Sequence, residues 1–196
     1  MCGITGFIDF NRQTSPTTLT SMTASMTHRG PDGSDTYFHQ NDAFQLGFGH
    51  RRLAILELSD LGKQPMRWND LVIVFNGEIY NFAAIKQTLE QLGHHFKSHS
   101  DTEMILHAYQ EWGSDCLKHF IGMFAIVIFN ETTQELFVAR DRAGIKPLFI
   151  YRHNNLLLFA SELKAFHEHP QFTKQLNIPA VHAYLQYGSV PTPHCI

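Results

Sequence analysis

The sequence predicts a layered domain of the α/β or α+β class, with a core of strands covered by helices. Apolar runs at 124–129 (FAIVIF) and 156–160 (LLLFA) are typical of strands buried on both faces. Other segments have apolar residues at helical spacing, and the two kinds alternate without the regular β-α-β rhythm of a parallel sheet. The chain of 196 residues is long enough to bury a sizeable core without disulfides or metal.

The first half of the chain is expected to contain strands at 3–10, 43–55 and 71–76, and a Gly/Pro loop at 28–33 (HRGPDG). A helix over 15–26 has Pro16 in its first turn. A second helix over 81–93 has Asn81 placed to cap it and Gly93 placed to end it.

The second half begins with a helix expected over 100–113, where Ser100 and Glu103 have the spacing of a capping box. Pairs of strands around polar turns are expected over 122–141 and 147–161, followed by a short helix over 161–169. Residues 178–196 are expected to form one more short helix and then a linker punctuated by Pro191 and Pro193.

Charge and hydropathy set limits on the partners of the protein. The formal net charge is -3, so no strong basic field directs the chain to nucleic acid or to an anionic membrane. No apolar run approaches the ~18 residues of a membrane span, and the first residues lack the pattern of a secretory signal. We therefore expect a cytoplasmic protein.

The cysteines and histidines do not predict a disulfide or a metal site. The three cysteines are Cys2, Cys116 and Cys195, and no pair has C-x-x-C spacing. His94, His95 and His99 lie close together in the sequence, but no Cys or carboxylate pattern accompanies them. Cys116 lies among apolar residues and is expected to be buried.

Cys2 has two interpretations. It is either an ordinary residue at the start of an edge strand or, after removal of Met1, a nucleophile that carries its own α-amine. An α-amine has a pKa of ~7.7–8.0 and can take a proton from an adjacent nucleophile near neutral pH. The two residues Met1 and Cys2 alone favour the ordinary interpretation.

Seven motifs in order reverse this preference: MCGITGF, HRGPDG, GHRRLAI, VFNGEIYNF, SDTE, ARDRAGIKPLF and FASELKAF. Together they resemble the glutaminase domain of class II glutamine amidotransferases, which are N-terminal-nucleophile hydrolases. Within that group the chain looks most like glutamine-hydrolysing asparagine synthetase, from Met1 to about Lys164. The resemblance implies an α+β fold, a four-layer αββα sandwich with two mostly antiparallel sheets. It also implies the hydrolysis of L-glutamine to glutamate and ammonia through a thioester.

The resemblance assigns the catalytic roles to Cys2, Asn76 and Gly77. Cys2 matches the nucleophile, while the Asn76 side chain and the Gly77 backbone N–H match the oxyanion hole. An Asn-Gly pair is equally typical of a plain turn at the end of a strand.

Substrate binding is assigned in the same way. Arg52 matches the residue that binds the substrate α-carboxylate, and Arg51 is the competing candidate. Successive residues of a strand face opposite sides, so only one of the two arginines should face the pocket. Asp101 matches the carboxylate that binds the α-ammonium, with Glu78 as a second contributor. Asp101 is also favoured by the dipole of the helix that it begins. The backbones around Leu53 and Ile55 are expected to line the pocket.

The resemblance divides the chain into a glutaminase domain at 1–170 and a helix and linker at 171–196. The linker would lead to an ATP-dependent synthetase domain that is missing here, so ATP and Mg²⁺ are expected only there and this chain needs no cofactor. The partners are then L-glutamine and that C-terminal domain, and a homodimer is left open.

Other functions stay open from the sequence alone. The glutaminase could belong to a relative that amidates a sugar, a peptide or an antibiotic precursor, and the chain could be a non-catalytic glutamine-binding module. Amidophosphoribosyltransferase and the hexosamine-forming amidotransferase share the MCGI opening. HRGPDG together with GHRRLAI and NGEIYN favours the asparagine synthetase branch over both.

Overall fold

Two antiparallel sheets form the centre of the fold. The computed structural model describes residues 1–54, 57 and 59–191. One sheet has the order β2 (Gly33–Gln40), β3 (Gln45–Arg52), β1 (Gly3–Asp9), β9 (Leu156–Ala160), β8 (Phe149–His153). The other has the order β4 (Met66–Trp68), β5 (Leu71–Ile79), β6 (Gly122–Asn130), β7 (Glu135–Arg140). All neighbouring strands pair antiparallel.

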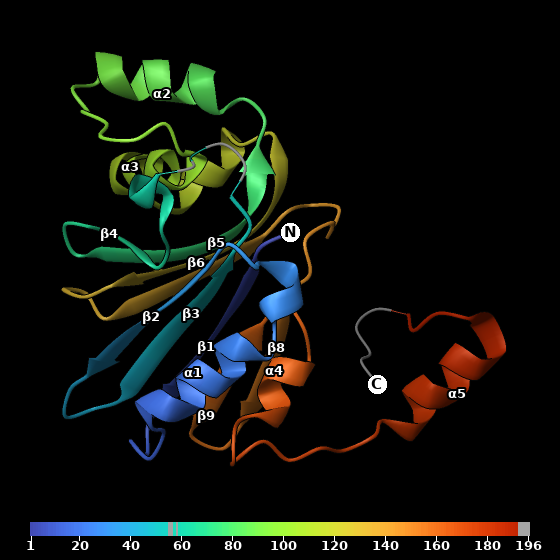
Figure 1. The fold of residues 1–196 in the computed structure, drawn as a ribbon. Coiled ribbons are helices and arrows are strands. Elements are labelled where there is room, and N and C mark those ends of the chain that lie inside the picture. The colour runs from blue at the N-terminus through green and yellow to red at the C-terminus, as the bar shows by residue number, and fades with distance from the viewer. Residues whose placement is uncertain (55–56, 58, 192–196) are drawn as a thin grey trace.

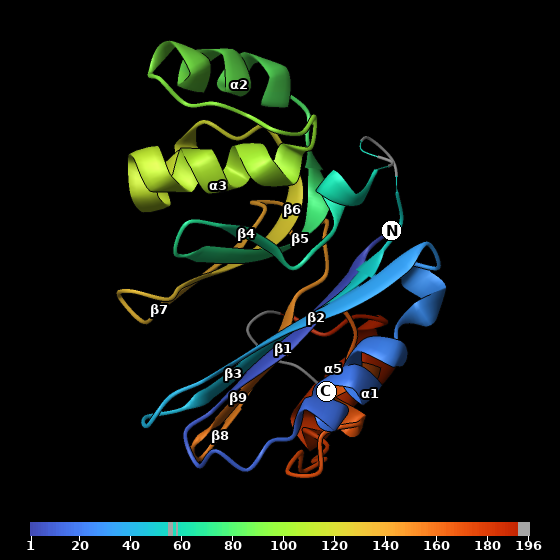
Figure 2. The same ribbon diagram turned by 60° about the vertical axis from the view of Figure 1, so that its left-hand side comes forward.

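Helices cover the outer faces of both sheets and make four layers (Figures 1 and 2). Helix α1 (Pro16–Ala24) and the one-turn α4 (Lys164–His167) pack on the sheet that contains β1. Helix α3 (Asp101–Trp112) packs on the sheet that contains β5, and α2 (Phe82–Gln91) lies on the far side of α3. The three apolar interfaces between the layers give the predicted αββα sandwich.

Strand β6 explains why its sequence is a continuous apolar run. Phe124, Ile126 and Ile128 face the helical layer of α3, while Val127 and Phe129 face the opposite sheet. Both faces of the strand are therefore buried, as the sequence predicted, and each residue removes its apolar surface from water.

Several element boundaries differ from those expected. Strand β5 continues through Asn76 and Gly77 to Ile79, so the Asn-Gly pair is not a turn. Strands β2 and β4 were not expected, because β2 is an edge strand with mostly polar residues and β4 has only three. Strand β1 lies between β3 and β9, so it is a central strand and not an edge strand.

The helix caps also differ in part. Asn81 makes no side-chain cap on α2, and its carboxamide instead bonds the His119 carbonyl and the Ile121 N–H. Ser100 caps α3 by accepting from the Glu103 N–H. The Glu103 carboxylate accepts from the backbone of residues 97 and 98, so only half of the predicted capping box forms.

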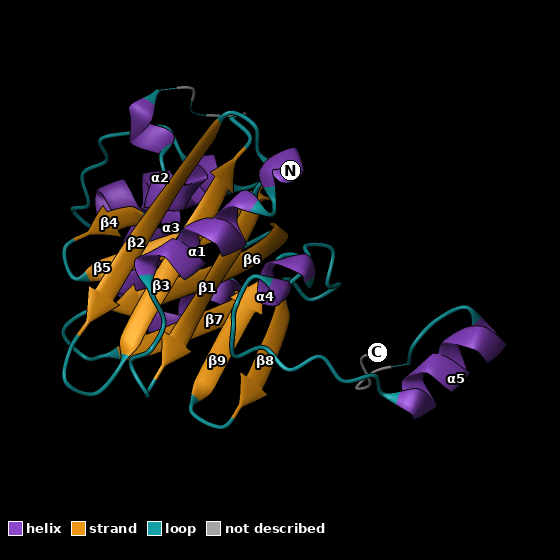
Figure 3. Cartoon of the chain, turned by 60° about the horizontal axis from the view of Figure 1, so that its bottom comes forward, coloured by secondary structure: helices purple, strands orange, loops and turns teal. Residues whose placement is uncertain are grey.

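The last described segment is helix α5 (Ile178–Tyr187), which Figures 1 and 3 show apart from the sandwich at the end of an extended stretch. Three short 3₁₀ helices complete the fold at Thr27–Arg29, Asp60–Gly62 and Gly113–Lys118. Cys116 is fully buried, as expected. Within the described residues, every helix is too short or too polar to cross a lipid bilayer.

Candidate active site

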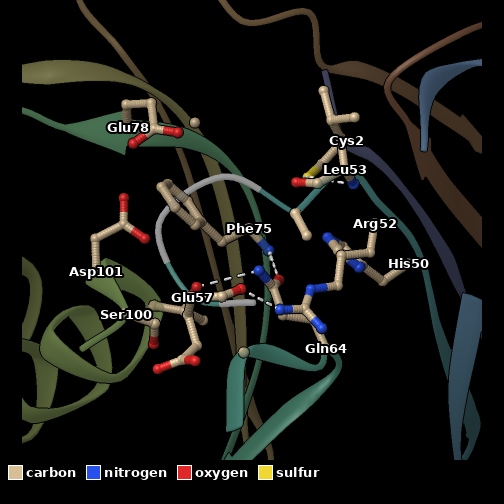
Figure 4. Close-up of a pocket in the computed structure, with 14 residues that line it drawn as sticks. Cys2, His50, Arg52, Leu53, Glu57, Gln64, Phe75, Glu78, Ser100 and Asp101 are labelled. Atoms are coloured by element: carbon tan, nitrogen blue, oxygen red, sulfur yellow. Dashed lines mark hydrogen bonds between the residues drawn. The ribbon is translucent and has the colours of Figure 1, made fainter. Parts of the chain in front are cut away.

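One cavity brings together six of the eight residues predicted for the site. Cys2, Arg52, Leu53, Gly77, Glu78 and Asp101 all line it. They come from the start of β1, the end of β3, the end of β5 and the first turn of α3, which meet at one end of the sandwich (Figure 4). Figure 4 shows Cys2 and Arg52 on one side of the cavity, with Glu78 and Asp101 on the other.

Cys2 is held next to the chain that leaves β3. Its Sγ lies 3.3 Å from the Leu53 backbone nitrogen, which donates to it, and 3.5 Å from the Leu53 carbonyl oxygen. Burial raises the pKa of the Cys2 thiol, and the Leu53 N–H opposes this rise by stabilising the thiolate. Residues 3–9 follow immediately as a central strand, so the position of the thiol is fixed by the sheet.

Arg52 is the arginine of the Arg51–Arg52 pair that lines the cavity. Its guanidinium donates to the backbone carbonyl of Glu57. The Arg51 side chain donates instead to the Gly30 carbonyl at 3.0 Å and is half-buried. The alternation of side chains along β3 thus separates the two arginines, as expected for a strand.

Asn76 and Gly77 lie side by side in β5, but only Gly77 lines the cavity. The Asn76 side chain is buried, and its Nδ2 atom has no hydrogen-bond partner among the described residues. A Cβ atom at Gly77 would lie 2.3 Å from the Met123 carbonyl oxygen, so only glycine fits between β5 and β6 there. The Asn76 amide is therefore a donor without an acceptor, beside a glycine whose backbone reaches the cavity.

Glu78 and Asp101 place two carboxyl groups in one half-enclosed space. Burial and the nearby Glu78 carboxylate raise the pKa of Asp101 to about 7, while the Ile79 N–H, 3.3 Å from Oδ2, lowers it. Burial also raises the pKa of Glu78, and the Lys146 ammonium opposes that rise. A cation that binds between two such carboxyl groups stabilises the ionised form of both.

Gln64, His50 and Arg29 are polar side chains at the site to which the sequence assigned no catalytic or binding role. Gln64 and His50 line the cavity and are buried. Arg29 donates to the Cys2 carbonyl at 2.9 Å and to Glu162 at 3.0 Å, so the HRGPDG loop holds the backbone of Cys2 directly. Arg29 and His50 lie within the motifs HRGPDG and GHRRLAI, whereas Gln64 lies in none of the seven and is brought to the site by the fold alone.

Two further predictions concern Ile55 and a metal site. Ile55 lies outside the described residues. The described part of the chain has no cluster of three or more His, Cys, Asp or Glu side chains that could hold a metal ion. The Nδ1 atom of His94 lies 2.8 Å from Nδ1 of His107, so these two rings share a hydrogen bond.

The arrangement suits an α-amino acid whose side chain carries an electrophilic carbon. A guanidinium can bind a carboxylate with parallel hydrogen bonds, and two carboxylates can bind an ammonium group. The thiol in the same cavity is a nucleophile for a carbonyl carbon.

Comparison with known proteins agrees with this chemistry. A family model described as a glutamine amidotransferase domain matches residues 1–196. Asparagine synthetase (glutamine-hydrolysing) 3 of Bacillus subtilis is 37% identical over 98% of this chain and 32% of its own length. Asparagine synthetase (glutamine-hydrolysing) 2 of the same organism is 39% identical over 90% of this chain and 24% of its own length. The chain thus spans about a quarter to a third of these two relatives.

Solved structures share the fold. Glutamine phosphoribosylpyrophosphate amidotransferase from B. subtilis, in complex with ADP and GMP, superposes with a TM-score of 0.71 at 25% identity. The match covers 85% of this chain and 43% of that chain. With the family model covering every residue, the chain belongs to the glutamine amidotransferase domain family.

Proposed function

We propose that this chain hydrolyses L-glutamine to L-glutamate and ammonia, with Cys2 as the nucleophile. The observation that carries the proposal is the shared cavity, in which a thiol and a guanidinium on one side face two carboxyl groups on the other. A glutamine molecule has the matching groups: an α-carboxylate, an α-ammonium and a side-chain amide at the distance of an extended side chain.

Substrate binding follows from the charges. Arg52 binds the α-carboxylate with the guanidinium N–H groups that are not used by the Glu57 carbonyl. Asp101, assisted by Glu78, binds the α-ammonium group. The ammonium supplies a positive charge beside Asp101, so binding lowers the pKa of Asp101 again.

The reaction then proceeds in two steps. The Cys2 thiolate attacks the side-chain amide carbon, and the Cys2 α-amine takes the thiol proton and gives it to the leaving nitrogen. The C–N bond breaks, ammonia leaves and a thioester remains on Cys2. Water attacks the thioester carbon, the C–S bond breaks, and glutamate leaves with the thiol restored. Asn76 Nδ2 and the Gly77 N–H stabilise the oxyanion in both steps.

The base in this mechanism exists only when Cys2 is the first residue. With Met1 attached, the Cys2 nitrogen belongs to a peptide bond and cannot take a proton. Met1 is exposed, so it lies in reach of an aminopeptidase. We therefore propose that the active form begins at Cys2.

The ammonia is proposed to serve a second, ATP-dependent reaction. The curated relatives are asparagine synthetases that extend far beyond the matched region. We propose that the full-length protein joins this glutaminase domain to a C-terminal synthetase domain, where ATP and Mg²⁺ would bind. Asparagine is the proposed product. The alternative is that the ammonia is transferred to a sugar, a peptide or an antibiotic precursor.

The test combines intact mass with ammonia release. The protein is prepared with Met1 removed and with Met1 retained, and both forms are incubated with L-glutamine. Only the form that begins at Cys2 should release ammonia and react covalently at Cys2 with an electrophilic glutamine analogue. Equal turnover by the form that keeps Met1 would refute the α-amine as base. No labelling and no ammonia from the processed form would favour a non-catalytic glutamine-binding module.

A further inference from the structure

A buried glutamine links the strand and the helix that carry the two ends of the site. Gln64 accepts a hydrogen bond from the Phe75 N–H at 2.7 Å and donates from Nε2 to Thr102 Oγ1 at 3.1 Å. Both of these partners are buried, as is Gln64. Figure 4 shows the Gln64 carboxamide beside the Phe75 backbone, inside the cavity wall.

Strand β5 needs this partner because its edge is open at Phe75. Strand β4 pairs with β5 only from Leu71 to Ile73, whereas β6 pairs with the other edge along the whole of β5. A buried N–H without a partner costs about 1–3 kcal/mol. The Gln64 oxygen takes the place of the missing strand there.

The two bonds of Gln64 fall next to the residues proposed to act on substrate. Phe75 immediately precedes Asn76 and Gly77, the proposed oxyanion donors, and Thr102 immediately follows Asp101. The carboxamide therefore spans the gap between the oxyanion end and the ammonium end of the cavity. We propose that Gln64 is a positioning residue that sets the separation of these two ends. This inference rests on the proposed glutaminase function.

The direction of the carboxamide is fixed by its partners. The Phe75 N–H can only donate, so Oε1 must face β5 and Nε2 must face the Thr102 hydroxyl. Loss of either bond leaves the hydrogen bond from the Ile79 N–H to Asp101 Oδ2 between β5 and the first turn of α3, so the two elements are held less firmly. A bound glutamine that bridges both ends would then make one of its contacts poorly, which weakens binding and slows acylation.

The test uses a matched pair of Thr→Val substitutions in the full chain with Met1 removed. Thr102→Val breaks the bond from Gln64 Nε2. Thr14→Val breaks a buried hydroxyl bond to Asp9, 2.8 Å long, in the other sheet. Thr102→Ser keeps the hydroxyl and serves as the conservative variant. Gln64→Met removes both bonds of the carboxamide. KM and kcat for L-glutamine and the thermal unfolding midpoint are measured for each.

A positioning role predicts that Thr102→Val lowers kcat/KM about tenfold, chiefly through KM, as expected for one buried hydrogen bond. Thr102→Ser should lie within about twofold of the unaltered chain, and Gln64→Met should lose more than Thr102→Val. Thr14→Val should lower the unfolding midpoint and leave KM unchanged. If Gln64→Met does not fold, the Thr102 pair decides.

The inference is overturned if Thr102→Val keeps the KM and kcat/KM of the unaltered chain, or if Thr14→Val raises KM equally. In the first case the bond does not act on the site, and in the second it acts only through stability. Failure of the unaltered, processed chain to release ammonia is a separate result, because it overturns the proposed function itself and this inference with it.

Discussion

The Sγ atom of Cys2 lies 3.3 Å from the backbone nitrogen of Leu53, which donates a hydrogen bond to it. This contact joins the start of β1 to the chain that leaves β3, immediately after Arg52. The proposed nucleophile and the proposed carboxylate-binding arginine are therefore held by the same short stretch of backbone. This hydrogen bond helps to fix the position of the Cys2 side chain, although Cys2 is only the second residue of the chain.

Cys2→Ala is expected to abolish ammonia release and to retain glutamine binding. Alanine removes the sulfur that attacks the amide, while the side chains proposed to bind the two α-substituents stay in place. Calorimetric titration with L-glutamine measures binding in the variant, and an ammonia assay measures turnover. Residual turnover above the background rate would contradict the assignment of Cys2 as nucleophile.

The KM for glutamine should rise as the pH falls below about 7. Asp101 must be ionised to bind an ammonium group, and burial and the Glu78 charge raise its pKa to about 7 in the empty site. Below this pH the free enzyme is increasingly protonated at Asp101, and KM should increase by up to about tenfold per pH unit. Steady-state kinetics between pH 5.5 and 8.5 measure the effect.

The control for this pH dependence is Asp101→Asn, which should have a high KM that no longer changes in the same range. A KM that is constant between pH 5.5 and 8.5 in the unaltered chain would argue against a titrating ammonium site.

Asp101→Asn should also stabilise the folded protein at alkaline pH. The pKa of about 7 in the folded protein lies above the ordinary value of 3.8, so the stability contributed by the protonated carboxyl is lost as pH rises from about 4 to 7. The variant escapes this loss and should gain about 2–4 kcal/mol at pH 8, with little difference at pH 4. Urea unfolding at the two pH values measures the difference.

Asp9→Asn provides the matched control of opposite sign. Burial raises the pKa of Asp9, but hydrogen bonds from Thr14, Gln13 and Asn11 outweigh burial and hold this pKa below its ordinary value. Its carboxylate therefore stabilises the fold at neutral pH, and Asp9→Asn should destabilise at pH 8. Equal shifts for the two variants would show that the charge at Asp101 is not the cause.

Gly77→Ala should destabilise the protein, by about 1–3 kcal/mol or more, because a Cβ atom would press on the backbone of β6. Gly33→Ala is the matched control, since a Cβ atom there meets the Arg52 side chain at an ordinary distance of 3.5 Å. Thermal and urea unfolding of both variants measure the difference. A Gly77→Ala protein as stable as Gly33→Ala would contradict the steric role of Gly77.

The elements that could be predicted from the sequence are those whose burial gives them a recognisable apolar pattern. Residues 124–129 are apolar throughout because β6 is covered on both faces. Strand β2 carries mostly polar residues at the sheet edge, so neither its length nor its partner is visible in the residues. Hydrophobic periodicity detects burial, and an exposed edge strand has little.

The same limit applies to the site. The motif resemblance singled out Cys2, Arg52 and Asp101, and the fold brings them to one cavity. Gln64 lies in none of the seven motifs, because it acts through the backbone of Phe75. Every residue except proline has a backbone N–H, so the residue type of Phe75 does not indicate that a side chain binds its backbone.

The central place of β1 has a consequence for synthesis on the ribosome. Strand β1 is made first, but one of its two neighbours is β9, which ends at Ala160. The first strand therefore cannot be enclosed on both edges until most of the domain has been translated. During that interval the start of the chain stays accessible to the enzymes that would remove Met1 in the proposed maturation.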